Sequence, residues 1–212
     1  ENINRDKKLR FFKTHNALCK INNFSFTDSK NTIAAIHIVR DPRNVVTSLS
    51  NHYQINKNEA FDFMKNEKKA LIEKKNNKFL GFVPLFSWKF HQESWSECKK
   101  FPVLTIRYED LQADTFKTFK SILKFLRDTA NSNIDINSDK INKVIKLCEF
   151  KKLQKLENDG GFKEALVSKK TNEKIKFFNL GKKNDFRNLL DKKMINEMTE
   201  FYKDQIKKYK YE

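Results

Sequence analysis

Short apolar runs that end in polar residues alternate with amphipathic stretches along this chain. Three runs are too short for helices and rich in β-branched or aromatic residues, so they predict strands at 9–15, 32–39 and 101–110. Alternation of this kind is typical of a mostly parallel sheet covered by helices, in which ligands bind at the carboxyl ends of the strands. The pattern therefore predicts an α/β fold with its site at that edge of the sheet. The residues at these strand ends are Lys13, His15, Arg40 and Tyr108.

The rest of the pattern predicts mostly helices. A charged stretch at 56–77 is typical of a surface helix, whereas bulky residues with helical spacing at 85–95 are expected to pack in the core. Further helices are expected after Pro42, after a cap near Asp114, at 141–148 and at 192–209, with a glycine break at 160–162 and a Lys-rich loop up to Phe177. Neither a repeat nor a linker divides the chain, so we expect a single domain over residues 1–212.

Composition narrows the class of protein. With 212 residues, 38% hydrophobic content and 20 Phe, the chain is long and apolar enough to form a folded core. No run approaches the roughly 18 apolar residues of a membrane span, and the start of the chain lacks a signal-peptide core. Three distant cysteines indicate neither disulfides nor a metal site. We therefore expect a cytoplasmic protein with reduced thiols, no transmembrane segment and no metal.

The net charge of +17 favours anionic partners, but its origin weakens that argument. Lys, Asn, Ile and Phe are enriched together, as happens with AT-rich coding, so most lysines are expected to be solvated surface. A nucleic-acid-binding protein would show a recognition motif beside the charge, and this sequence has none. We therefore expect no nucleic-acid partner.

The most informative stretch is 33–48, where an apolar strand turns into a helix. Asp41 is suited to be the N-cap and Pro42 the first helical residue, so free backbone N–H groups would face an anion there. Arg40 ends the strand and Ser48 lies two turns into the helix, from where one phosphate could touch both. In an alternative interpretation Arg40 pairs with a carboxylate such as Asp41. Arginine is scarce in this chain, with 7 among 44 basic residues. Its use at this position favours the phosphate site, because the forked guanidinium can bind a phosphate through two hydrogen bonds and a lysine cannot.

Several segments together resemble the PAPS-dependent sulfotransferase family, which moves a sulfuryl group from 3'-phosphoadenosine 5'-phosphosulfate (PAPS) to an acceptor hydroxyl or amine. They follow the family's order over about residues 9–190. The matching elements are Lys13-Thr14-His15, Arg40 with Ser48, Arg107-Tyr108-Glu109-Asp110-Leu111, the stretch from Phe150 through Leu153 and Glu157 to Gly161 and Phe162, and Gly181 with Asp185, Phe186 and Arg187. Each motif alone is common, whereas their ordered combination is specific.

The resemblance implies a P-loop nucleotide-hydrolase-like fold in three layers, with PAPS as the donor and adenosine 3',5'-bisphosphate as the product. It implies that His15 is the general base and that Lys13 offsets charge on the transferred group. Arg40 and Ser48 would grip the 3'-phosphate, and Tyr108 would lie near the adenine. The expected cofactor-binding residues are completed by Phe150, Lys182 and Arg187. The acceptor is expected to be a small-molecule, carbohydrate or lipid hydroxyl.

The chain departs from the family pattern in two important places. The strand and the Lys-Ser-Gly-Thr-Thr-like loop that hold the 5'-phosphosulfate do not occur: the sequence has no glycine before Gly81. Because residue Glu1 is also not an initiator Met, we expect an N-terminally truncated domain. Asn179-Leu180 replaces a basic pair that grips the 3'-phosphate in the family. Lys182 and Lys183 could substitute for that pair, and Arg187 is another candidate.

Two other interpretations stay open. The chain could be a basic nucleotide- or polyanion-binding module that keeps Arg40 and Ser48 without performing chemistry. It could also be a P-loop kinase relative, an idea that rests on shared architecture alone. The histidines without a matching family role are His37, His52 and His91. The oligomeric state is left open, with a homodimer as one option.

Overall fold

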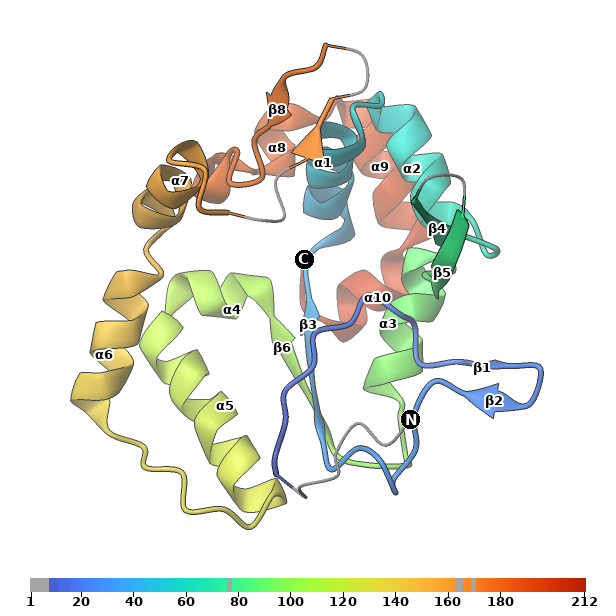
Figure 1. Ribbon diagram of the computed structural model, residues 1–212. Helices are drawn as coiled ribbons and strands as arrows, with labels where there is room; N and C mark the ends of the chain where they lie inside the picture. The colour runs from blue at the N-terminus through green and yellow to red at the C-terminus, as the bar shows by residue number, and fades with distance from the viewer. Residues whose placement is uncertain (1–7, 76–77, 163–165, 169–170) are drawn as a thin grey trace.

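The computed structural model describes residues 8–75, 78–162, 166–168 and 171–212. In this part of the chain, helices surround a parallel pair of strands (Figure 1). The strands are β1 (Lys20–Ile21), β2 (Phe24–Ser25), β3 (Ala35–Val39), β4 (Ala70–Lys75), β5 (Lys78–Pro84), β6 (Val103–Arg107), β7 (Leu166–Val167) and β8 (Lys174–Ile175). The helices are α1 (Pro42–Tyr53), α2 (Lys57–Lys65), α3 (Trp88–Ser96), α4 (Tyr108–Ala113), α5 (Thr115–Thr129), α6 (Ser138–Leu147), α7 (Phe150–Asn158), α8 (Phe186–Leu189), α9 (Lys192–Phe201) and α10 (Lys203–Lys208), with a 3₁₀ helix at Gly181–Lys183.

β3 and β6 form the parallel pair at the centre of the fold. They run in register from Ala35 beside Val103 to Val39 beside Arg107. Helix α3 contacts both strands, and α4 and α5 contact β6. In the view of Figure 1, α4 and α5 lie to the left of the pair and α3 and α10 to its right. The predicted parallel sheet with flanking helices is therefore confirmed. Strands form within both 32–39 and 101–110, but residues 108–110 begin helix α4 and do not extend the strand.

The main hydrophobic core lies where the helices meet at the carboxyl end of β3. Its members are Val39, Val46, Ala60, Phe61, Met64, Trp88, Phe186, Leu190, Met194, Met198, Tyr202, Ile206, Tyr209 and Tyr211. Tyr202 is fully buried, and its ring centre lies 5.0 Å from that of Trp88. The chain turns at Tyr202, so the single helix expected at 192–209 is two helices, α9 and α10. This turn lets side chains from both helices reach the same core.

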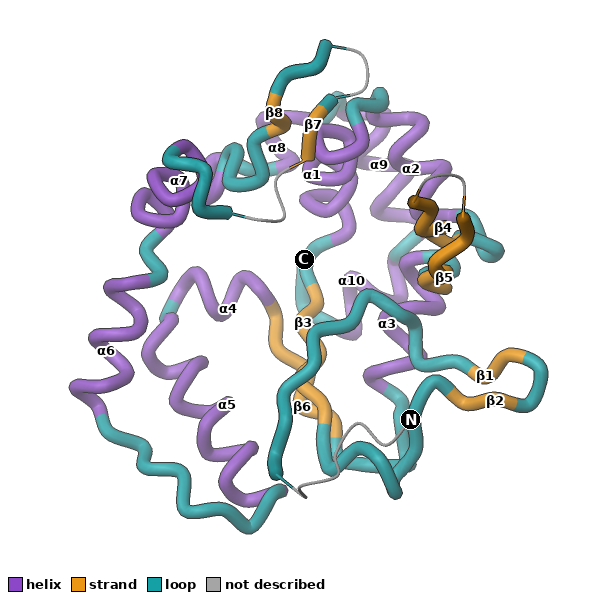
Figure 2. Tube along the Cα trace, in the orientation of Figure 1, coloured by secondary structure: helices purple, strands orange, loops and turns teal. Residues whose placement is uncertain are grey.

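The strand expected at 9–15 does not form. Residues 8–19 belong to no helix or strand, and Phe11 and Phe12 are about 70% exposed. A strand needs a ladder of backbone hydrogen bonds to a neighbour, but β3 pairs only with β6 among the described residues. Figure 2 draws this segment as a loop that crosses in front of the parallel pair.

The charged stretch at 56–77 is not one surface helix. Helix α2 ends at Lys65, and β4 then pairs with β5 as an antiparallel hairpin. Within the hairpin, Leu71 pairs with Val83 and Ile72 with Phe82, so apolar residues beyond the charged stretch stabilise it. Helix α2 also buries part of its surface, at Ala60, Phe61 and Met64.

Arg43 joins the start of α1 to the segment that follows α10. Its Nε lies 3.0 Å from Asp41 Oδ1 and its Nη2 lies 2.8 Å from Asp41 Oδ2. The two side chains are only 8% and 6% exposed. Arg43 also donates to the Thr199 hydroxyl at 3.2 Å and to the Tyr211 carbonyl at 2.5 Å. One guanidinium therefore connects α1, α9 and the segment after α10.

Arg107 makes a similar connection at the end of β6. Its Nη1 donates to the carbonyls of Tyr209 and Lys210 at 3.0 and 2.8 Å, and its Nε donates to Asp110 at 2.9 Å. Two arginines thus fasten residues 209–211 to the carboxyl ends of both parallel strands.

The described residues include no helix long and apolar enough to cross a membrane. Within the same residues, no three His, Cys, Asp or Glu side chains are placed to hold a metal ion together. The cysteines Cys19, Cys98 and Cys148 carry free thiols.

We expect Arg43→Leu to lower the free energy of unfolding by about 3–5 kcal/mol, because it leaves the Asp41 carboxylate buried and unpaired. The control is Arg127→Leu, since the ion pair of Arg127 among the described residues is with the exposed Asp128, at 3.3 Å. That variant should change the free energy of unfolding by less than about 1 kcal/mol. Denaturant unfolding followed by circular dichroism measures both values. Small and equal changes in the two variants would contradict the role given to Arg43.

Candidate functional site

Arg40 follows β3 and meets α1 and α4. Its Nη1 donates to Ser48 Oγ at 3.4 Å, and its guanidinium carbon lies 4.5 Å from the centre of the Tyr108 ring. The Nε atom of Arg40 is buried without a hydrogen-bond partner among the described residues. An unpaired buried donor costs free energy, so it marks a place that an anionic oxygen can stabilise. We call Arg40, Ser48 and Tyr108 the Arg40 corner.

The carboxylate next to Arg40 in the sequence, that of Asp41, is bound by another arginine. Both oxygens of Asp41 bind Arg43, so the alternative in which Arg40 pairs with Asp41 is not the arrangement found. Arg40 instead lies against Tyr108 and Ser48, where its guanidinium is left for another partner.

The backbone N–H groups at the start of α1 are not free, contrary to the expectation from the sequence. The Asp41 N–H donates to Glu109 Oε1 at 3.1 Å, and the Arg43 N–H donates to the side chain of Asp41 at 2.9 Å. The next two N–H groups, of Asn44 and Val45, both donate to the Asp41 carbonyl at 2.9 Å. Pro42 has no N–H. An anion at this corner therefore has to be recognised by side chains.

Asn184 supports the Arg40 corner from a distant part of the chain, and the sequence did not reveal it. It is 9% exposed, and its Nδ2 donates to Ser48 Oγ at 2.8 Å and to the Asn44 carbonyl at 3.2 Å. Its Oδ1 accepts a hydrogen bond from the Thr47 hydroxyl. A lone asparagine gives no local signal, because its partners lie more than 130 residues earlier. This network attaches the turn after the 3₁₀ helix to the face of α1 that carries Ser48.

Phe150 and Gly181, two residues of the motifs, are in direct contact. Gly181 has a φ of +54°, and a Cβ added there would lie 2.7 Å from the Phe150 ring. Phe150 also packs edge-to-face on Phe178, with ring centres 6.1 Å apart. Glu157, further along α7, accepts hydrogen bonds from the N–H groups of Phe177 and Phe178. Helix α7 is thereby fixed to the segment that leads into the 3₁₀ helix.

The basic residues expected near the cofactor lie in two successive short helices and are both exposed. Lys182 is exposed in the 3₁₀ helix. The Arg187 side chain is 65% exposed, its Nη1 lies 3.3 Å from Asp185 Oδ1, and its guanidinium carbon lies 4.7 Å from the centre of the Phe186 ring. Arg187 is therefore held by Asp185 and Phe186.

His15 and Lys13 lie in the loop that replaces the expected strand, and both are exposed. The His15 carbonyl lies 3.3 Å from Nε2 of His91 in α3. Burial lowers the pKa of His52, and electrostatic repulsion from His15 lowers it further. His52 lies one turn beyond Ser48 on α1. The candidate base is therefore within electrostatic range of α1, the helix that carries Ser48.

His37 faces the protein interior. Its Nε2 lies 2.7 Å from Gln92 Oε1 and its Nδ1 lies 3.3 Å from the Thr105 hydroxyl. Burial lowers the pKa of His37 to about 4, so this histidine is neutral at neutral pH. Its hydrogen bonds connect β3 to α3 and β6.

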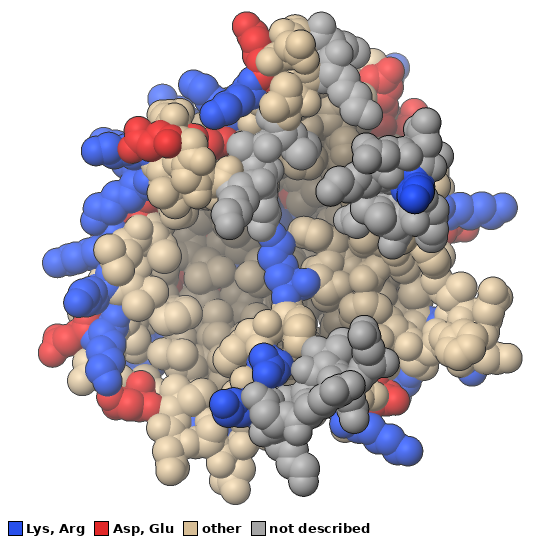
Figure 3. Space-filling model, in the orientation of Figure 1, with Lys and Arg blue, Asp and Glu red and all other residues tan. Residues whose placement is uncertain are grey.

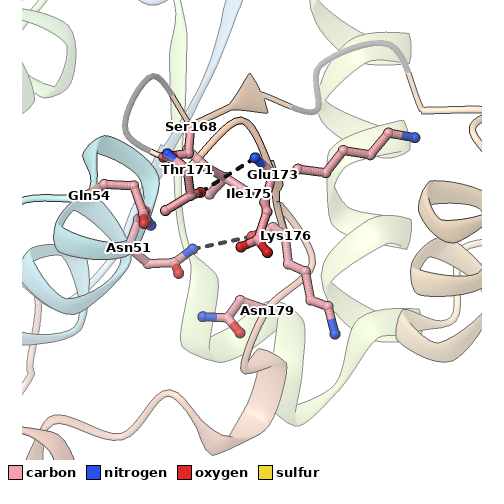
Figure 4. Close-up of a pocket in the computed structure, with 9 residues that line it drawn as sticks. Asn51, Gln54, Ser168, Thr171, Glu173, Ile175, Lys176 and Asn179 are labelled. Atoms are coloured by element: carbon pink, nitrogen blue, oxygen red, sulfur yellow. Dashed lines mark hydrogen bonds between the residues drawn. The ribbon is translucent and has the colours of Figure 1, made fainter.

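One face of the molecule is hollowed. Figure 3 shows a depression near the centre of this face, with mostly uncharged walls and basic side chains at its edge. A separate pocket of about 190 Å³ lies between the end of α1 and the β7–β8 hairpin (Figure 4). Its lining residues are Asn51, Gln54, Ser168, Thr171, Glu173, Lys174, Ile175, Lys176 and Asn179. Asn51 Nδ2 donates to the Lys176 carbonyl at 3.2 Å across this pocket.

A family model for the sulfotransferase domain matches residues 1–210. The chain belongs to the sulfotransferase domain family. Among solved structures, it is similar to a mouse sulfotransferase, SULT7A1, in complex with PAP, with a TM-score of 0.50 and 19% sequence identity. The likeness covers 81% of this chain and 57% of the mouse chain, so the present sulfotransferase domain spans little more than half the length of that relative. It supports the α/β fold. A comparison with curated proteins found no match.

In this sulfotransferase domain, we expect Gly181→Ala to cost more stability than Gly160→Ala. Both glycines have positive φ, at +54° and +78°, but a Cβ at Gly160 would meet no atom within 4 Å. Gly160→Ala should therefore cost only the roughly 1–2 kcal/mol of the left-handed conformation. Gly181→Ala should add about 1–3 kcal/mol, because its Cβ would overlap the Phe150 ring.

Denaturant unfolding of both variants, alone and with Phe150→Ala, measures this difference. The additional cost at Gly181 should disappear in the Phe150→Ala background, because the two residues are then no longer in conflict. An additional cost that survives the loss of the ring would rule out this contact as its cause.

Proposed function

We propose that this protein is a sulfotransferase that moves a sulfuryl group from PAPS to an acceptor hydroxyl or amine and releases adenosine 3',5'-bisphosphate. The observation that carries the proposal is the Arg40 corner at the carboxyl end of β3. Family membership supports the reaction class, and the side chains of the corner support a site for the 3'-phosphate there.

The Arg40 corner has donors suited to a phosphate. Ser48 Oγ accepts hydrogen bonds from both Arg40 and Asn184, so its own hydrogen is left to donate to a third partner. Arg40 Nε is a second unused donor, and the guanidinium adds positive charge. Tyr108 holds the plane of the guanidinium and offers a ring near the expected adenine position. Phe150, Lys182 and Arg187 are the remaining proposed cofactor-binding residues.

For the chemical step, we assign the role of general base to His15. The oxygen of the acceptor hydroxyl attacks the sulfur of PAPS, its proton passes to the imidazole of His15, and the bond from sulfur to the 5'-phosphate oxygen breaks. Adenosine 3',5'-bisphosphate leaves with the electron pair of that bond. Lys13 supplies positive charge beside the transferred group. A neutral imidazole has a nitrogen lone pair that can accept this proton.

The acceptor is proposed to be a small-molecule, carbohydrate or lipid hydroxyl. The second candidate function is a basic module that binds nucleotides or polyanions without chemistry, which the Arg40 corner would serve equally well. Turnover separates the two functions. The single domain, the cytoplasmic location and a homodimer stay predictions from the sequence.

We expect Arg40→Ala to weaken binding of adenosine 3',5'-bisphosphate by about 2 kcal/mol, roughly 30-fold, because it removes a charge-assisted hydrogen bond. Ser48→Ala should have a smaller effect of the same sign. Arg127→Ala removes the same charge from α5 and should leave the affinity unchanged. Calorimetric titration at two salt concentrations separates a site from the bulk charge. Equal affinities for the Arg40 and Arg127 variants would refute the proposed phosphate site.

We expect His15→Ala to lower kcat by about 10²–10⁴-fold while the affinity for adenosine 3',5'-bisphosphate changes little. The reason is that His15 would act on the acceptor and not on the nucleotide. Transfer of ³⁵S from labelled PAPS to a panel of hydroxyl acceptors measures turnover. Full turnover in the variant would exclude His15 as the base, whereas nucleotide binding without any turnover in the unaltered protein would favour the binding module.

A further inference from the structure

One face of α3 holds the backbone at and after His15. His91, Ser94 and Trp95 are spaced at i, i+3 and i+4, so they share this face. Their contacts are His91 Nε2 with the His15 carbonyl (3.3 Å), the Trp95 indole N–H with the Asn16 carbonyl (2.9 Å) and the Ser94 hydroxyl with the Leu18 N–H (3.0 Å). These side chains bind the backbone of residues 15–18, at the end of the segment that lacks a neighbouring strand.

The contact with the His15 carbonyl determines which ring nitrogen of His91 carries the proton. A carbonyl oxygen accepts but cannot donate, so Nε2 of His91 has to carry the proton. Nδ1 of His91 is buried and has no hydrogen-bond partner among the described residues. Burial also lowers the pKa of His91, and this favours the neutral ring at neutral pH. The arrangement is a neutral imidazole whose Nε2–H donates to the His15 carbonyl.

His91 is also well fixed itself. It lies within α3, and its own carbonyl accepts a hydrogen bond from Ser94 Oγ at 2.7 Å. Trp95, one turn later on the same face, is 7% exposed and packs edge-to-face on Phe26. The donor that reaches His15 therefore comes from a rigid helix, whereas the acceptor belongs to an exposed loop.

We propose that His91 is a positioning residue for His15. The proposal rests on the proposed role of His15 as general base. A residue in an exposed loop has many accessible conformations, and fixing its carbonyl restricts the directions in which its imidazole can point. Ser94 and Trp95 fix the residues that follow, and His91 acts at residue 15 itself.

Two variants of His91 test this role in opposite directions. His91→Leu fills the space but removes the donor, whereas the longer amide of His91→Gln can place an N–H near the position of Nε2. We expect the Leu variant to lower kcat by about 10- to 100-fold, with the affinity for adenosine 3',5'-bisphosphate unchanged. The Gln variant should recover most of the turnover. A purely structural role would lower nucleotide affinity and turnover together, and equal losses in the two variants would overturn the proposal.

A second readout does not depend on catalysis. NMR of the imidazole signals of His15, with amide hydrogen exchange at Leu18, reports the order of this loop directly. We expect shifted His15 signals and faster exchange in His91→Leu, and near-normal values in His91→Gln. If the unaltered protein neither binds the nucleotide nor transfers a sulfuryl group, the proposed function fails. The NMR readout still tests the contact between His91 and the His15 carbonyl.

Should His91→Leu not fold, His91→Asn replaces it, because the shorter amide stays polar but does not reach the carbonyl. It is expected to behave as the Leu variant does. Unchanged His15 signals in a folded variant without the donor would overturn the proposal.

Discussion

Both oxygens of the Asp41 carboxylate, buried at the start of α1, bind the guanidinium of Arg43. A carboxylate in this environment needs such a partner, because the cost of its desolvation is large and is offset only by close, hydrogen-bonded pairing. The pairing has two consequences. It lets Asp41 cap α1, and it leaves Arg40 to meet Ser48 and Tyr108 instead of the nearest acid. Arg43 binds the buried carboxylate, and Arg40 stays available for a ligand. The proposed site at the carboxyl end of β3 depends on this arrangement.

Further polar contacts around this ion pair connect the site to distant parts of the chain. Arg43 also binds the Tyr211 carbonyl, Glu109 accepts from the Asp41 N–H, and Asn184 binds the α1 face that carries Ser48. The proposed nucleotide site is thus built on regular elements joined by buried polar contacts. The proposed base lies in a loop that one face of α3 holds. Nucleotide binding and the chemical step should for this reason respond separately to mutation, as the predicted effects of the Arg40 and His15 variants require.

Local signals account for what the sequence predicted well. The strand and helix around Arg40 were predicted because strand composition, the Asp41 cap and Pro42 all act within a few residues. Pairing with distant segments accounts for the failures. The sequence did not predict the hairpin at 70–84, because charged residues of β4 pair with a strand beyond the charged stretch. The strand predicted at 9–15 was wrong, because apolar composition alone does not ensure that a neighbouring strand is present to pair with it. Asn184 gave no signal, and Glu109 satisfies an N–H that the sequence left free for an anion.

The central claim is that the Arg40 corner recognises a 3'-phosphate. The most direct test compares adenosine 3',5'-bisphosphate with adenosine 5'-monophosphate by calorimetry, for the unaltered protein and for Arg40→Ala. We expect the unaltered protein to prefer the bisphosphate by about 10- to 100-fold, the value of one charge-assisted contact. We also expect Arg40→Ala to lose this preference while it keeps its affinity for the monophosphate. The same preference in both proteins would contradict the claim, because the 3'-phosphate would then bind elsewhere.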